Sequence, residues 1–296
     1  MIKGLAITPP VIGRISIGRV VEKNGKRIPE KEDQFTITSQ IQGKEGWIPH
    51  PLDEILRNSA PSGKIRSVPV KVLFNDPDLN LRAGFSLFDR NTGRPLCVGN
   101  GETCKRVCSD GMQEGICPSP DACEFGAKLG CKPYGRLNVQ IAAQEDELGS
   151  FVFRTTGFNS IRTLAARLQY FQAISGNLLA CLPLEMKLRG KSTTQSHRTP
   201  IYYVDLTIRE GMSLNEAISQ ARKLDEERRE LGIDQQALDL AARNGFANGA
   251  FEESEEEGSE IVEEFFPEAV EGESQAAAGS LKEKLRDRAE KTGGVA

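Results

Sequence analysis

The sequence predicts an α+β protein with a β-rich, barrel-like body, a cysteine-rich insertion, a helical arm and a disordered acidic tail. Three observations predict this organisation. Short alternating segments recur through the first 210 residues, six of the seven cysteines fall between Cys97 and Cys131, and a glutamate-rich stretch begins after Gly249. We therefore place the body at 1–210, the insertion at 97–131, the arm at 211–249 and the tail at 250–296.

The body is predicted from runs that alternate β-branched or aromatic residues with polar ones, a pattern typical of half-buried strands. Arg90–Gly93, which follows the run at 81–89, suggests a hairpin turn. Several short strands around one helix suggest a partly open barrel. The predicted strands are 12–21, 34–39, 68–74, 81–89, 136–142, 149–155, 184–188 and 201–208.

The clearest helix of the body begins near Asn159 or Ser160, either of which can cap its N-terminus. Apolar residues then recur at helical spacing through Phe171, and Pro183 closes the segment. The arm is predicted as two further helices, 213–231 and 234–244. A short terminal helix is predicted at 281–291, within the tail.

Charge divides the chain unevenly. From Phe251 to Ser274 there are eleven Glu and no Lys or Arg, whereas residues 1–250 carry 33 basic and 28 acidic side chains. A mildly basic body is compatible with nucleic acid, and an acidic tail can compete for that body or bind a further protein. Phe265-Phe266-Pro267 inside the acidic run resembles the partner-binding tips of bacterial single-stranded DNA-binding proteins, although here the element is internal.

The apolar segments indicate a cytoplasmic protein with no membrane partner. No apolar run approaches the roughly 20 residues that span a bilayer. Pro9 and Pro10 interrupt the N-terminal apolar stretch and Arg14 ends it, so there is no signal-peptide pattern. In a reducing compartment, clustered cysteines are more often metal ligands than disulfides.

The cysteine segment predicts a structural zinc site, a zinc knuckle, because it has no hydrophobic periodicity of its own and is rich in Gly and Pro. Three residues separate Cys104 from Cys108, a spacing that lets one tight turn supply two ligands. Cys117 and Cys131 would return from the far side of a loop, with Cys123 an alternative ligand to Cys117. A four-iron cluster, free thiols and disulfides stay open as alternatives.

Catalysis by this chain is not predicted. The only histidines, His50 and His197, lie far from the cysteines in sequence, so no ligand set with an open position is visible. The P-loop, the G-x-S-x-G elbow, H-E-x-x-H and G-x-G-x-x-G are absent from the sequence.

Basic side chains in two places are candidate nucleic-acid or partner contacts. A Ser/Thr-rich loop between the last two predicted strands can contact phosphates, and two arginines flank the start of the body helix. The structural alternatives are that the loop is merely solvated and that the two arginines form only local salt bridges. Tyr134, Phe151, Phe153 and Phe158 can stack on bases, with burial as the alternative. The basic candidates are Arg154, Arg162, Lys187, Arg189, Lys191 and Arg198.

Two segments carry a family resemblance. They are Gly130-Cys-Lys-Pro-Tyr-Gly-Arg-Leu-Asn-Val139 and Gly149-Ser-Phe-Val-Phe-Arg-Thr-Thr-Gly-Phe-Asn159. The chain resembles the recombination directionality factors that partner serine integrases of actinobacterial phages and integrative elements, best over 97–179. The resemblance implies Cys104, Cys108, Cys117 and Cys131 as the shared thiols, an integrase as partner, and a switch from integration to excision without catalysis.

The sequence therefore favours a non-enzymatic, zinc-binding accessory factor of DNA recombination on a mobile element. It would act by direct binding to a recombinase, with DNA contacts secondary. A single-stranded DNA binding or annealing protein is the alternative, and a metal-dependent hydrolase is a weaker one.

Overall fold

The computed structural model describes most of the chain from Pro10 to Phe266, including a helix inside the acidic segment. The described ranges are 10–23, 26–43, 46–142, 144–146, 148–192, 200–246 and 258–266. The predicted terminal helix at 281–291 lies outside the described residues.

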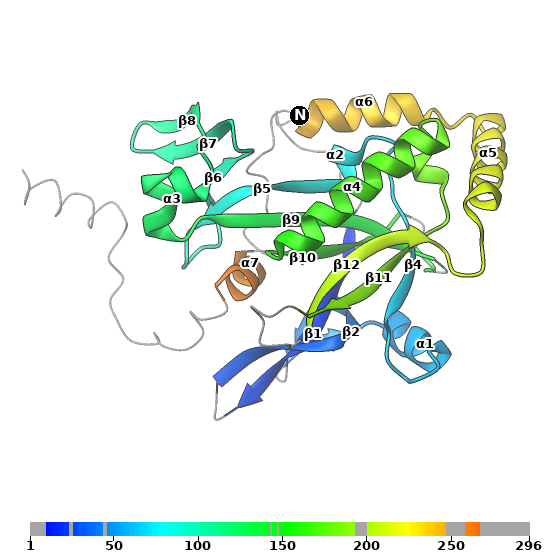
Figure 1. The fold of residues 1–296 in the computed structure, drawn as a ribbon, viewed down its shortest axis with the longest axis horizontal. Coiled ribbons are helices and arrows are strands. Elements are labelled where there is room, and N and C mark those ends of the chain that lie inside the picture. The colour runs from blue at the N-terminus through cyan, green and yellow to red at the C-terminus, as the bar shows by residue number, and fades with distance from the viewer. Residues whose placement is uncertain are drawn as a thin grey trace, which may run out of the picture.

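One long, mostly antiparallel sheet organises the molecule (Figure 1), with strands in the order β3-β2-β1-β10-β9-β5-β6-β7-β8. Strands β1 and β10 pair in parallel although about 140 residues separate them, whereas the other pairings along this path are antiparallel. These strands are β1 (Val11–Lys23), β2 (Lys26–Gly43), β3 (Gly46–Pro49), β5 (Leu81–Phe88), β6 (Pro95–Gly99), β7 (Thr103–Cys108), β8 (Gly111–Ile116), β9 (Lys132–Ile141) and β10 (Ser150–Thr155).

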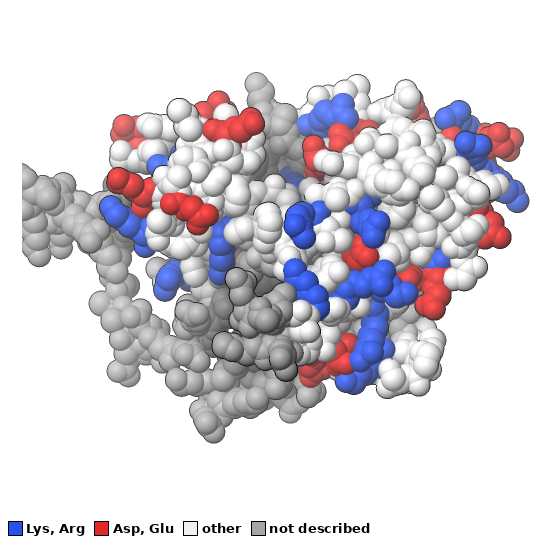
Figure 2. Space-filling model, viewed as in Figure 1, with Lys and Arg blue, Asp and Glu red and all other residues white. Residues whose placement is uncertain are grey.

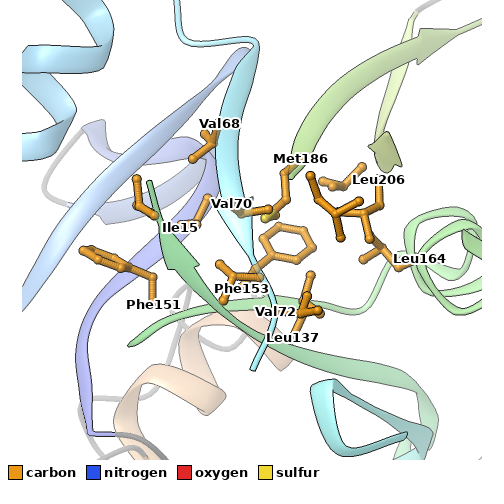
Figure 3. Close-up of a cluster of buried hydrophobic side chains, with 14 of the residues drawn as sticks. Ile15, Val68, Val70, Val72, Leu137, Phe151, Phe153, Leu164, Met186 and Leu206 are labelled. Carbon is orange, nitrogen blue, oxygen red and sulfur yellow. The ribbon is translucent and has the colours of Figure 1, made fainter. Parts of the chain in front are cut away.

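The sheet branches at β9. The first part of β9 pairs with β5 and β10, while its last residues, Gln140 and Ile141, pair with β4 (Ser67–Lys71). Strand β4 continues to β11 (Leu184–Lys191) and then to β12 (Ile201–Ile208). The branch brings residues from distant parts of the chain around one core, which includes Ile15, Val68, Val70, Val72, Leu137, Phe151, Phe153, Leu164, Met186 and Leu206 (Figure 3).

The barrel-like closure expected from the sequence is wrong. The path ends in β3 on one side and β8 on the other, and no pairing joins these two strands. The branch at β9 buries the apolar faces that closure would otherwise bury.

Helix α4 (Phe158–Ser175) forms where the apolar spacing predicted a helix, and it packs on β12. Its N-cap is Gly157 and not Asn159 or Ser160. The Ser160 hydroxyl instead accepts a hydrogen bond of 3.0 Å from the backbone N–H of Val204, which fixes the first turn of α4 to β12.

The two predicted arm helices are α5 (Leu214–Glu230) and α6 (Gln235–Phe246). Helix α5 begins at a capping box between Ser213 and Glu216. Helix α6 returns to the body, where Asp239 accepts hydrogen bonds from the backbone N–H of Asn75 and Arg243 forms an ion pair of 2.7 Å with Asp76. In Figure 1, α6 runs along the top of the molecule and α5 lies at its right side.

The remaining helices were not predicted. They are α1 (Pro51–Ser59), α2 (Pro77–Asn80), η1 (Pro120–Ala122), α3 (Glu124–Leu129), η2 (Leu179–Cys181) and α7 (Gly258–Phe265). Helix α7 lies in the part of the tail at 250–296 that was expected to be disordered, before the predicted terminal helix. Among the helices that the structure describes, none is long and apolar enough to cross a membrane.

Candidate metal centre and basic face

The cysteine segment continues the main sheet instead of forming a separate loop. Strands β6, β7 and β8 extend the sheet beyond β5, and η1 and α3 fold back over one face of this extension. A small pocket lies between the strands and α3. Its lining includes five thiols, from Cys97, Cys104, Cys117, Cys123 and Cys131, together with Phe85, Leu87, Arg106 and Phe125.

Two glycines leave room for the thiols. A Cβ at Gly99 would lie 2.6 Å from Sγ of Cys117 and 2.9 Å from Cβ of Cys104. A Cβ at Gly126 would lie 2.9 Å from Cβ of Cys131. The sheet side of the pocket thus holds Cys104 and Cys117 close together, and α3 holds Cys123 and Cys131.

Cys108 does not line the pocket, although it was a predicted ligand. Residues 104–108 form part of strand β7, so the tight turn expected between Cys104 and Cys108 is not present. A strand advances about 3.4 Å per residue, which separates these two positions by about 13 Å. Cys108 lies at the end of the β7–β8 hairpin, opposite Gly111, and Cys123 takes its place at the pocket.

Burial favours the neutral thiol form of Cys104 and Cys131 by raising the pKa of each. Burial and the neighbouring thiols of Cys97, Cys117 and Cys123 raise the pKa of Cys131 to about 11. Burial is the main cause that raises the pKa of Cys104, and the neighbouring Cys97 thiol raises it further. Cys123 has two donors near its sulfur, the backbone N–H of Gly126 at 3.3 Å and the Arg106 guanidinium at 3.8 Å.

The donor chemistry suits a thiophilic metal ion, but the side chains are not arranged as a formed site. Four thiolates make a closed structural zinc centre, and the pocket has five thiols from which to draw them. Across the described ranges, however, no group of three or more His, Cys, Asp or Glu side chains is positioned to hold a metal ion. Ligation would require these thiols to turn toward a common centre.

The predicted basic contacts lie mainly on one face. Figure 2 shows Lys and Arg gathered where β11, β12 and α4 meet. Arg162 is exposed on α4, and Arg189 and Lys191 are exposed on β11. Asp205 of β12 forms ion pairs with Arg167 at 3.0 Å and with Arg189 at 3.2 Å. Lys191 donates a hydrogen bond of 2.9 Å to Asn159. We name the set Arg162, Arg167, Lys187, Arg189 and Lys191 the basic face.

One predicted contact does not join this face, and another is not described by the structure. Arg154 is only 4% exposed within β10, so it cannot present its charge to a ligand. Arg198 lies outside the described residues. Of the aromatic candidates for base stacking, Tyr134, Phe151 and Phe153 are buried and Phe158 is 56% exposed, so only one of the four predicted rings is available to a base.

The β7–β8 hairpin presents an apolar surface that sequence reasoning missed. Val107 lies opposite Met112 in the ladder, and both are about half exposed. Ile116 follows on the same face of β8 and is 82% exposed. We name Val107, Met112 and Ile116 the hairpin face. Strand β8 is the open edge of the sheet beside it.

Comparison with protein families agrees with the resemblance seen in the sequence. The structure defines the class of protein: an open α+β fold whose main sheet is extended by a cysteine-rich segment. The model of the Gp3-like family, described as recombination directionality factor-like, matches residues 12–209. This match covers about two thirds of the chain, and the chain belongs to that family. No curated protein and no solved structure matched the chain in the corresponding comparisons.

Proposed function

We propose that the chain is a non-enzymatic accessory factor that binds a serine integrase directly and directs recombination on a mobile element toward excision. Membership of the recombination directionality factor-like family carries this proposal. The matched residues include the whole cysteine-rich extension and the basic face. Both surfaces therefore belong to the part of the chain that defines the family.

The hairpin face is the surface we assign to the integrase. Three large apolar side chains are exposed on one face of the hairpin beside an open sheet edge, with the Lys105–Glu114 ion pair between Met112 and Ile116. Exposed apolar side chains next to an unpaired strand edge are features of protein association sites. Neither strand of the hairpin has another described element covering this face.

The test is direct binding between the chain and an integrase encoded beside it. A Val107→Ser/Met112→Ser/Ile116→Ser variant should bind the integrase at least about tenfold more weakly, because each buried apolar side chain contributes about 1.5–3 kcal/mol. Ile55→Ser is the matched control, since Ile55 is 58% exposed on α1. Equal loss of binding in the control, or unchanged binding by the hairpin variant, would contradict this assignment.

The second part of the proposal is a structural zinc ion held by Cys104, Cys117, Cys123 and Cys131. Zinc would cross-link the sheet side of the pocket to α3 and stiffen the base of the hairpin. Cys97 lies opposite Arg106 in the β6–β7 ladder and is the surplus thiol. The positive charge of Arg106 would offset part of the net charge of about −2 on a tetrathiolate zinc centre.

The basic face favours DNA contact as a third element of the proposal. Its side chains are cations on an exposed sheet and helix surface, which suits phosphates and not base edges. DNA binding would then be secondary to integrase binding and independent of sequence. Single-stranded DNA binding as the main function is less favoured, because three of the four candidate stacking rings are buried.

A further inference from the structure

Helix α7 packs against the body beside the cysteine-rich extension, although its sequence belongs to the acidic segment (Figure 1). Ile261 and Phe265 are fully buried and Phe266 is 7% exposed. The residues that receive them are Phe88 at the end of β5 and Tyr134 on β9. These residues form a separate apolar cluster and do not join the main core.

The contact is specific as well as apolar. The rings of Phe88 and Phe265 meet edge to face with centroids 4.9 Å apart. Arg90 lies over the ring of Phe266 at 4.8 Å, and Lys132 lies over the ring of Phe265 at 4.5 Å. Lys132 also donates a hydrogen bond to the backbone carbonyl of Phe265, at the helix C-terminus.

Two glycines allow the helix to approach the β5–β6 turn closely. A Cβ at Gly258 would lie 2.2 Å from the carbonyl oxygen of Thr92. A Cβ at Gly93 would lie 2.1 Å from the carbonyl oxygen of Gly258. The position of α7 therefore depends on contacts at both of its ends.

The sequence and length of α7 indicate that it is a ligand of this surface and not part of the core. Eight residues are too few to form a stable helix alone, so the helix depends on docking. The segment Gly258–Phe266 contains three glutamates and no cation, whereas its receiving surface contributes Lys132 and Arg90. The two cations contact the aromatic rings and the carbonyl end of α7, and their charge is opposite to that of the segment as a whole.

We propose that Phe88, Arg90, Lys132 and Tyr134 form a docking site for an acidic helix that ends in two adjacent aromatic residues, and that α7 is its displaceable intramolecular ligand. A partner protein with a helix of this chemistry would compete with α7. The site adjoins the thiol pocket through Cys131 and Lys132, so displacement would act beside the cysteine-rich extension. The proposal does not depend on a role in recombination.

The test uses a fluorescent peptide of residues 256–267 and the full-length chain. The unmodified chain should bind the peptide weakly, because the tethered α7 has an effective concentration on the order of millimolar. Phe265→Ala/Phe266→Ala and, separately, Gly258→Val should each undock α7 and strengthen peptide binding by about tenfold or more. Gly258→Val leaves the aromatic residues of α7 unchanged, so the two variants undock it by different means.

Lys132→Glu in the Phe265→Ala/Phe266→Ala chain should then weaken peptide binding by about tenfold, whereas Lys128→Glu on α3 should not. Circular dichroism checks that each variant remains folded. Failure of the peptide to bind either undocked variant would overturn the proposal. The proposal would also be overturned if the unmodified chain bound the peptide as tightly as the undocked variants do. Exchange of α7 between two copies of the unmodified chain in a dimer would overturn it as well.

Discussion

At the scale of single residues, the thiols carry the clearest chemistry. Their grouping could be predicted from the sequence, and Cys104, Cys117 and Cys131 do line one pocket. The exclusion of Cys108 from the pocket could not be predicted, because a three-residue spacing fits a turn and a strand equally well. Only the pairing of β7 with β6 and β8 decides between them.

The thiol pocket predicts the metal content of four variants. The purified chain should contain about one zinc ion, and Cys104→Ser or Cys131→Ser should lose it, because each removes one of four ligands. Cys108→Ser and the buried control Cys181→Ser should retain it. Elemental analysis checks all four. Zinc retained by Cys131→Ser, or lost from Cys108→Ser, would contradict the proposed ligand set.

The pH dependence of this site follows from the raised pKa of Cys131. Its pKa rises from 9.0 to about 11, so the buried neutral thiol stabilises the metal-free fold below pH 9. That contribution is lost as the pH rises through 11. Zinc must displace these protons, so its affinity should fall as the pH is lowered, as a zinc titration monitored with a competing chelator would measure.

At the scale of elements, local sequence patterns predicted where several strands and helices lie, but they did not predict how the strands pair. Strand β12 was predicted with its observed bounds, Ile201–Ile208, and the hairpin at Arg90–Gly93 joins β5 to β6 as expected. Strands β7 and β8 were missed because β8 is exposed throughout and its sequence does not alternate. Helix α7 has a signal that was overlooked: Ile261, Val262, Phe265 and Phe266 recur at helical spacing within the glutamates.

The side chains of the basic face come from two elements, α4 and β11, and their DNA contacts should be separable from folding. Lys187→Ala/Arg189→Ala/Lys191→Ala should weaken DNA binding and reduce the slope of log K against log salt by about 2–3, because each lost phosphate contact contributes about 0.7–0.9. Arg167 still pairs with Asp205 in this variant. Binding isotherms at several salt concentrations measure the slope.

The control replaces three exposed cations of α5, Arg222, Lys223 and Arg229, with alanine. It removes the same charge from a different surface. A slope reduced equally by both triple variants would show that net charge, and not the basic face, controls DNA binding.

At the scale of the whole molecule, the open sheet separates surfaces with different chemistry. The hairpin face lies at the β8 edge, the basic face lies on the branch formed with β11 and β12, and α7 docks on β5 and β9 between them. The branched open sheet was not predicted, and a partly open barrel was expected instead, because the parallel pairing of β1 with β10 and the branch at β9 join segments far apart in sequence. Such long-range pairings leave no local pattern.

The most direct test of the recombination role is an assay of recombination direction with a purified serine integrase encoded beside the chain. Substrates carrying the integrated-element junctions and substrates carrying the unrecombined attachment sites are compared with and without the chain. We predict that the chain activates excision and suppresses integration, and that the triple hairpin-face variant loses both effects while Ile55→Ser keeps them. An unchanged direction of recombination, with the integrase active and the chain folded, would contradict the account.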